Sequence, residues 1–120
     1  MKATILVVDD MDEVRQMLTV VLGNAGYDVI SAATVGEALK LADAATPDLM
    51  LIDVRMGEYN GLQVAVRERA RGRDVPVIIM SGHYDPVLTA EAERLGAVFL
   101  PKPFEPAQLL AQIESLLRVN

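Results

Sequence analysis

The chain has 120 residues, the size of a single domain, and 52% of them are hydrophobic, enough to fill a core. Its net charge of −6 argues against a surface that binds nucleic acid. With no cysteine and one histidine, the composition excludes disulfides and cysteine nucleophiles and argues against a histidine-rich metal site. Apolar stretches fall short of the roughly 20 residues that span a bilayer, and the start of the chain lacks the apolar region of a signal peptide. We therefore expect one soluble, cytoplasmic domain over residues 1–120, without a membrane contact.

Five short apolar runs alternate with five amphipathic segments along the chain. In order, the expected strand and helix of each pair are 4–8 and 12–24, 28–32 and 34–45, 49–53 and 62–71, 75–80 and 86–95, and 97–100 and 106–118. Thr34 and Glu37 have the spacing of a capping box, and Asp85-Pro86 is typical of a helix start. Segment 54–60 is expected to be a loop. The alternation is typical of βα units, so it predicts an α/β domain with a mostly parallel sheet.

Polar residues stand at the ends of four of these apolar runs. Asp9 and Asp10 follow the first run, and Asp53 ends the third. Ser81 follows the fourth run, and Lys102 comes shortly after the fifth. Because parallel strands end at the same edge of a sheet, where open α/β sheets bind ligands, we expect these five side chains to converge.

The residue types at this edge suit a divalent cation and a phosphoryl group. Neighbouring carboxylates repel one another unless a cation lies between them, and Mg²⁺ prefers oxygen ligands. A carboxylate can also accept a phosphoryl group as an acyl phosphate. The ammonium of Lys102 and the hydroxyl of Ser81 could then contact the phosphoryl oxygens, so the pattern indicates phosphoryl-group chemistry assisted by Mg²⁺.

The ordered set of motifs resembles the receiver domain of bacterial two-component response regulators. The residues behind this resemblance are Val7-Val8-Asp9-Asp10, Asp53 with Gly61 eight residues later, Ser81-Gly82 and Lys102-Pro103-Phe104. The match covers nearly the whole chain in the family's order and spacing. It implies a doubly wound, five-stranded parallel sheet of order 2-1-3-4-5 with five flanking helices, the flavodoxin-like receiver fold. It also implies either a single-domain, chemotaxis-regulator-like protein or a fragment of a longer regulator.

The resemblance further implies a role for each residue at the sheet edge. Asp53 would be the phosphoacceptor, and Mg²⁺ would be held by Asp9, Asp10, Asp53 and the backbone carbonyl of Arg55. Lys102 would pair with the phosphoryl group, Ser81 would be the switch hydroxyl, and Phe99 would turn inward with Ser81. The side chains of Arg55 and His83 would tune the lifetime of the acyl phosphate. A cis bond is expected at Lys102-Pro103, as is usual in the family.

Partners are implied in the same way. The phosphodonor would be a phosphohistidine on a sensor histidine kinase or a phosphotransfer protein. The face built from the fourth helix, fifth strand and fifth helix would bind a downstream protein or a second copy of the chain. Direct binding of nucleic acid is not expected, nor is enzyme activity beyond the domain's own phosphorylation and dephosphorylation.

The sequence departs from the family pattern and leaves other readings open. Gly57 stands where proline is common, and Phe99 lacks the hydroxyl of the tyrosine often found there. Asp9 and Asp10 also suit a helix N-terminus, and Lys102 taken alone could be an ordinary solvated lysine. The alternative functions are a Mg²⁺-dependent phosphatase or phosphotransferase with an aspartyl nucleophile, and a docking module that is not phosphorylated.

Overall fold

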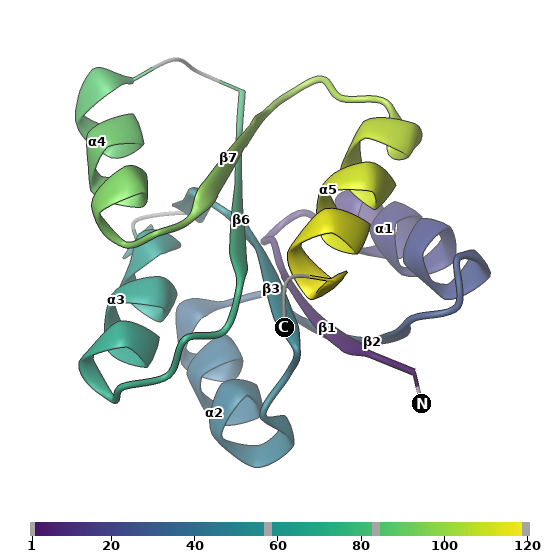
Figure 1. Cartoon of the computed structure of the whole chain (residues 1–120), viewed down its shortest axis with the longest axis horizontal. Coiled ribbons are helices and arrows are strands. Elements are labelled where there is room, and N and C mark those ends of the chain that lie inside the picture. Colours follow the sequence, from purple (N-terminus) through teal and green to yellow (C-terminus); the bar gives the residue numbers. More distant parts are fainter. Residues whose placement is uncertain (1, 57–58, 83–84, 119–120) are drawn as a thin grey trace.

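The computed structural model describes residues 2–56, 59–82 and 85–118. Within them, five parallel strands form the central sheet in the order β2-β1-β3-β6-β7, the predicted order 2-1-3-4-5 (Figure 1). The strands are β1 (Thr4–Val8), β2 (Asp28–Ala32), β3 (Leu49–Asp53), β6 (Val77–Ser81) and β7 (Val98–Pro101). The predicted doubly wound α/β fold is therefore confirmed.

Helices cover both faces of this sheet (Figure 1). They are α1 (Asp12–Asn24), α2 (Val35–Ala45), α3 (Leu62–Ala70), α4 (Pro86–Arg94) and α5 (Pro106–Arg118). Leu18 of α1 and Leu109 of α5 belong to the apolar cluster on one face, whereas Ala38 of α2, Val64 of α3 and Ala92 of α4 belong to the cluster on the other. None of these helices is long and apolar enough to cross a bilayer, in the part of the chain that is described.

The central strands are apolar along their whole length because both of their faces are covered. Every residue of β3 and β6 is buried, which explains their runs of aliphatic side chains without alternation. Both strands end on a polar residue, Asp53 in β3 and Ser81 in β6, and both residues are buried. A buried polar group needs a partner, so the strand ends are where the fold must supply one.

The segment before α3 differs from the expected loop. Arg55–Met56 (β4) and Tyr59–Asn60 (β5) pair as a short antiparallel hairpin. The hairpin returns the chain to the end of β3, where the Gly61 N–H donates to the Val54 carbonyl at 2.9 Å. Asn60 Oδ1 accepts a hydrogen bond from the Leu62 N–H at 2.8 Å and so forms a turn around Gly61, the residue that precedes α3. Gly57, the departure from the family's usual proline, lies outside the described residues.

Other element boundaries shift by one or two residues. The fourth strand begins at Val77 rather than at residue 75, and the fifth strand is displaced by one position. The expected caps are confirmed: Thr34 Oγ1 accepts from the Glu37 N–H at 3.1 Å, and Asp85 Oδ1 accepts from the Val87 N–H at 2.9 Å.

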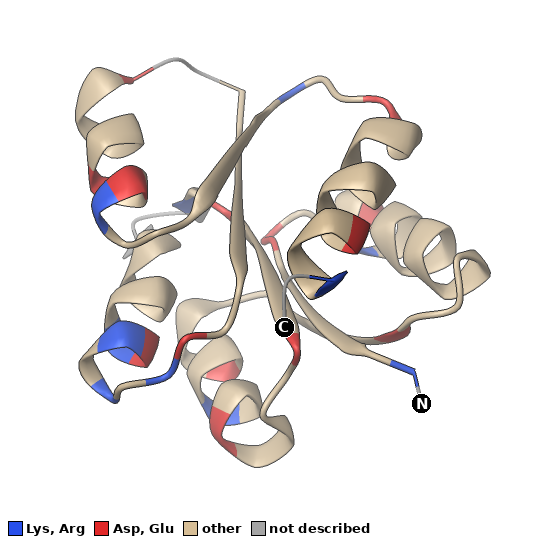
Figure 2. Cartoon of the chain, viewed as in Figure 1, with Lys and Arg blue, Asp and Glu red and all other residues tan. Residues whose placement is uncertain are grey.

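A cluster of charged residues connects the C-terminal ends of α2 and α3, at the edge of the sheet opposite the carboxyl ends of the strands (Figure 2). Asp43 of α2 forms ion pairs with Arg67 at 2.9 Å, Arg71 at 2.7 Å and Arg73 at 3.2 Å. Partial burial opposes the ionisation of Asp43, but the hydrogen bonds and charges of the arginines outweigh it and lower the pKa of this carboxyl.

Candidate functional site

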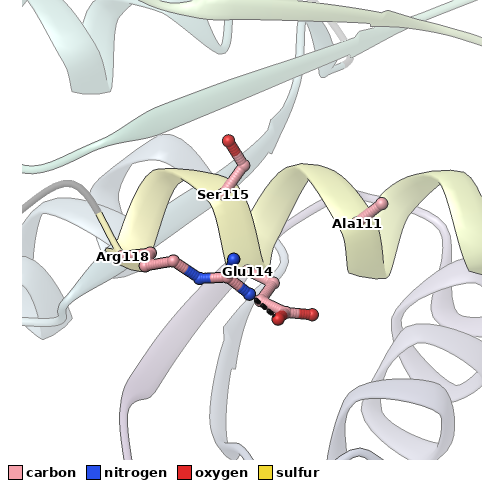
Figure 3. A pocket seen from close by; sticks show the side chains of 4 residues that line it. All are labelled: Ala111, Glu114, Ser115 and Arg118. Atoms are coloured by element: carbon pink, nitrogen blue, oxygen red, sulfur yellow. Dashed lines mark hydrogen bonds and ion pairs between the residues drawn. The ribbon is translucent and has the colours of Figure 1, made fainter.

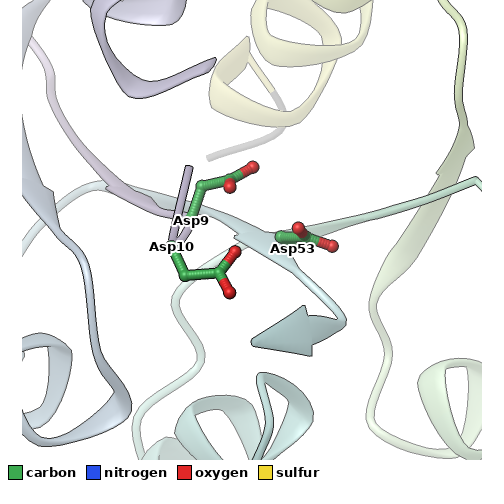
Figure 4. A group of neighbouring side chains, drawn as sticks. All are labelled: Asp9, Asp10 and Asp53. Carbon is green, nitrogen blue, oxygen red and sulfur yellow. The ribbon is translucent and has the colours of Figure 1, made fainter. Parts of the chain in front are cut away.

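The end of the sheet brings the predicted polar residues together. Asp9, Asp10 and Asp53 place carboxylate oxygens within 4.8 Å of one another, at the ends of β1 and β3 (Figure 4). Asp9 and Asp53 are buried, whereas Asp10 is exposed. Three carboxylates at this separation form a site of high negative charge.

Asp9 is held in place by its backbone and by one of its carboxylate oxygens. Its N–H donates to the Ala32 carbonyl at 3.1 Å, which continues the β1–β2 ladder by one residue. Its Oδ1 accepts from the Met11 N–H at 2.9 Å. The other oxygen, Oδ2, is buried and has no hydrogen-bond partner among the described residues. It lies 3.7 Å from the ammonium of Lys102.

The surroundings of Asp9 disfavour its charge. Burial raises the pKa of Asp9, the hydrogen bond from the Met11 N–H lowers it, and the negative charges of Asp53 and Asp10 raise it further, so that the balance lies above the ordinary value. The attraction of Lys102 offsets only part of this. A buried oxygen without a partner, beside two more carboxylates, fits the needs of a hard cation, so this group could hold a metal ion.

Lys102 joins the site from the position directly after β7. Its Nζ lies 3.5 Å from Asp53 Oδ2 as well as 3.7 Å from Asp9 Oδ2, and its side chain is 27% exposed. The backbone holds it there, because the Lys102 N–H donates to the Ser81 carbonyl at 2.8 Å. The predicted cis bond between Lys102 and Pro103 is present.

Asp53 is fixed by the turn that follows β3. Its Oδ1 accepts from the Arg55 N–H at 3.1 Å, which leaves Oδ2 facing Lys102. Gly61 packs directly against this turn. A Cβ at position 61 would clash with the Asp53 carbonyl oxygen and lie 2.7 Å from Cγ2 of Ile52. The glycine is therefore required by close approach rather than by an unusual φ, which is −58°.

The remaining predicted residues lie around this centre. Ser81 is buried at the end of β6, next to Lys102 through its carbonyl. Phe99 is half-buried in β7 and packs on the cluster that α2, α3 and α4 cover. The Arg55 side chain is exposed beside the site. His83 lies outside the described residues.

Sequence reasoning missed one residue that contacts the site. Arg15 of α1 donates from Nη1 to the Asp9 carbonyl oxygen at 2.7 Å. A signal was present, because a basic residue in the first turn opposes the helix dipole, and helical side chains point back toward the N-terminus. An arginine at this place therefore indicates an acceptor in the preceding turn.

Surface hollows of the described residues also lie outside the acidic group, and two of them bear on the site or on α5. One is lined by residues of α1 and of the turn after β7, and it adjoins the site through Lys102; its apolar lining includes Val14, Met17 and Phe104. The other lies on α5 and is lined by Ala111, Glu114, Ser115 and Arg118, with an ion pair between Glu114 and Arg118 (Figure 3).

Comparison with known proteins agrees with this geometry. The family described as "Response regulator receiver domain" matches residues 5–114. The chain is 35% identical to the alkaline phosphatase synthesis transcriptional regulatory protein PhoP of Bacillus subtilis, over 98% of this chain and 50% of PhoP. It is 37% identical to the transcriptional regulatory protein FixJ of Bradyrhizobium diazoefficiens, over 98% of this chain and 58% of FixJ. The chain thus spans about half the length of these curated relatives.

Among solved structures, the chemotaxis protein CheY4 of Vibrio cholerae superposes with a TM-score of 0.87 at 33% identity, covering 97% of this chain and 99% of CheY4. The N-terminal domain of a Wolinella succinogenes protein superposes with a TM-score of 0.90 at 31% identity, covering 98% of this chain and 95% of that one. The strand order, the acidic strand ends and these matches lead to one conclusion: the chain belongs to the receiver domain family of two-component response regulators.

Proposed function

We propose that Asp53 accepts a phosphoryl group from a phosphohistidine donor, and that residues 1–120 act as one receiver domain. The observation that carries the proposal is the 3.5 Å ion pair between Asp53 Oδ2 and Lys102 Nζ, beside the carboxylates of Asp9 and Asp10. One acceptor oxygen and one cation thus share a site whose other carboxylates suit a metal ion.

The proposed transfer exchanges one bond to phosphorus for another. A carboxylate oxygen of Asp53 attacks the phosphorus, and the new P–O bond forms as the P–N bond to the donor imidazole breaks. The electron pair leaves with the imidazole nitrogen, which takes a proton from solvent. Lys102 stays within ion-pair distance of Asp53 and so offsets charge on the phosphoryl oxygens. Hydrolysis of the acyl phosphate by water restores Asp53 and releases phosphate, so the domain catalyses only its own phosphorylation and dephosphorylation.

Asp9, Asp10, Asp53 and the backbone carbonyl of Arg55 would hold Mg²⁺. When bound, the ion supplies positive charge that neutralises the phosphoryl oxygens. Asp9 contributes its otherwise unpartnered Oδ2, and Asp10 contributes a carboxylate that solvent can reach. The side chains of Arg55 and His83 are proposed to tune how long the acyl phosphate lasts.

The proposed output is a rearrangement on one side of the domain. The Ser81 hydroxyl would move toward the phosphoryl group, and Phe99 would turn inward into the space that this opens. Ser81 precedes α4 and Phe99 is part of β7, so both belong to or adjoin the face formed by α4, β7 and α5. A downstream protein or a second copy of the chain would bind there, where Glu91 and Arg94 pair on α4 and Glu114 and Arg118 pair on α5.

A sensor histidine kinase or a phosphotransfer protein is the proposed donor, in keeping with the cytoplasmic location expected from the sequence. The hollow beside Lys102 supports a donor approach from this side, because its apolar lining would contact a partner while the imidazole reaches Asp53.

The test is the intact mass after incubation with Mg²⁺ and acetyl phosphate. We expect a gain of about 80 Da, one phosphoryl group, that requires Mg²⁺ and is absent in Asp53→Asn. Asp28→Asn is the matched control, because Asp28 is an exposed aspartate at the start of β2. A gain that persists in Asp53→Asn would contradict the assignment of the acceptor. Absence of a gain from both acetyl phosphate and a phosphorylated histidine donor would contradict the proposed function.

A further inference from the structure

Arg15 occupies an unusual place for a basic residue. It is the fourth residue of α1, so its charge lies near the positive end of the helix dipole, where acidic residues such as Asp12 and Glu13 are favoured. Its side chain is nevertheless only 18% exposed and turns back toward the end of β1. A cation held in this position needs a specific acceptor.

The acceptor is the backbone of the acidic pair. Arg15 Nη1 donates to the Asp9 carbonyl oxygen at 2.7 Å, a bond across six positions of the chain. The same guanidinium pairs through Nη2 with Asp12. Within the described residues, Met11 makes no side-chain cap at the start of α1, and Arg15 ties the helix to the turn before it together with the bond from the Met11 N–H to Asp9 Oδ1.

This bond completes the restraints on Asp9. The Asp9 N–H is bound to Ala32, Oδ1 to Met11 and the carbonyl to Arg15. Oδ2 is left aimed at the neighbouring carboxylates and Lys102. Since the peptide plane that contains the Asp9 carbonyl also leads into Asp10, fixing that carbonyl restricts the backbone on which both carboxylates stand.

The alternative is that Arg15 serves only its ion pair with Asp12. That pair is a surface interaction three residues apart in one helix, and Asp12 is 78% exposed, so the pair contributes little. A charge-assisted bond to a carbonyl from a side chain that is only 18% exposed is stronger and more directional. The two roles predict different consequences for the acidic site.

We infer that Arg15 is a positioning residue for Mg²⁺ binding, acting through the Asp9 carbonyl to hold Asp9 and Asp10 in a ligating arrangement. This inference rests on the proposed function. It adds to that function a residue that contacts neither the ion nor the phosphoryl group. Groups that orient metal ligands typically change metal affinity by 10–100-fold when they are removed.

The experiment is a titration of the unphosphorylated protein with MgCl₂, followed by the amide signals of its ¹H–¹⁵N NMR spectrum. Arg15→Met and Arg15→Gln remove the charged donor, and we expect the dissociation constant for Mg²⁺ to rise about tenfold in both, the lower end of that range. Arg15→Lys keeps a cation that can donate to the carbonyl, so its dissociation constant for Mg²⁺ should lie between that of the native protein and those of Arg15→Met and Arg15→Gln. The same spectra report whether each variant keeps the native sheet.

Two controls separate the carbonyl bond from the ion pair. Asp12→Asn removes the partner in the helix and keeps the bond to Asp9, so Mg²⁺ affinity should change less than twofold. Arg94→Met removes an arginine that makes a similar pair three residues away in α4, far from the site, and should also change affinity less than twofold.

Each remaining outcome is decisive. A folded Arg15→Met or Arg15→Gln protein with unchanged affinity overturns the positioning role and leaves the proposed function standing. An Asp12→Asn protein that weakens binding as much as Arg15→Met assigns the effect to the ion pair and also overturns the inference. If the native chain does not bind Mg²⁺, the proposed function fails together with the inference.

Discussion

Replacing Asp9 by asparagine should make the metal-free protein more stable while it removes the proposed metal site. Asp9 is fully buried, and burial and two neighbouring carboxylates raise its pKa. Asparagine has nearly the same shape and keeps an oxygen that can accept the Met11 N–H at the position of Oδ1. The substitution therefore removes charge and changes little else.

The magnitude follows from the distances at the site. With an effective dielectric constant of about 20, two like charges 4.8 Å apart repel by roughly 3.5 kcal/mol, and opposite charges 3.7 Å apart attract by roughly 4.5 kcal/mol. Neutralising Asp9 removes the repulsions from Asp53 and Asp10 and the attraction to Lys102, which leaves about 2–3 kcal/mol in favour of the variant. Solvent screens the exposed Asp10, so we expect a net gain of about 1–2 kcal/mol.

The assay is urea-induced unfolding of both proteins, first in EDTA and then in increasing MgCl₂. In EDTA, Asp9→Asn should unfold at higher urea, whereas the exposed control Asp28→Asn should match the native protein within about 0.5 kcal/mol. Added Mg²⁺ should stabilise the native protein in proportion to its occupancy of the site and leave Asp9→Asn unchanged. If Asp9→Asn is less stable than the native chain in EDTA, the reasoning about repulsion at this site is wrong.

Two further predictions concern the turn after β3 and the cluster on α2. Gly61→Ala should lower the free energy of unfolding by about 1–3 kcal/mol and slow labelling by acetyl phosphate, because the added Cβ displaces the Asp53 carbonyl. Gly36→Ala in α2, where a Cβ would meet only Thr34 Oγ1 at 4.0 Å, an ordinary van der Waals contact, should instead be neutral or stabilising by up to about 1 kcal/mol; equal losses in the two variants would refute the close-packing argument. Asp43→Asn should be less stable than the native protein at pH 7. Because the pKa of Asp43 is lowered in the folded state, its contribution is present above the unfolded pKa of about 4 and is lost as the pH falls through the folded value. Unfolding curves between pH 7 and pH 3 should therefore converge, and a gap that stays constant would contradict this assignment.

The sequence was sufficient to predict the elements whose signals are local or periodic. The run 49–52 is apolar throughout because the strand is buried on both faces, and the strand ends on a polar residue, Asp53, that is also buried. The caps at Thr34 and Asp85 depend on residues within three positions, so their spacing was enough. Convergence of Asp9, Asp53 and Lys102 followed from the rule that parallel strands end at one edge.

Features that depend on contacts between distant segments could not be predicted in this way. The β4–β5 hairpin has two residues per strand, too few for a pattern of alternation, and it is fixed by the return of Gly61 to Val54. The three arginines that meet at Asp43 come from a segment 24 to 30 residues away in sequence, so no local pattern indicates that they share one carboxylate. The bond from Arg15 to Asp9 is local, but its acceptor is a backbone carbonyl, so a basic residue in the first turn of the helix indicates that an acceptor exists without identifying Asp9.

The formal charges at the site explain why a divalent cation suits it before and after phosphorylation. Three carboxylates and the ammonium of Lys102 give a charge of −2, which one divalent ion balances. Phosphorylation would convert the Asp53 carboxylate into the uncharged acyl part of a mixed anhydride and add a phosphoryl dianion, so the negative charge of the site would increase by about one unit. The site would therefore attract a cation more strongly in the phosphorylated form, and the repulsion expected to destabilise the metal-free protein is the same interaction that a bound cation would relieve. Neutralising Asp9 should therefore raise stability and abolish function through one change in charge.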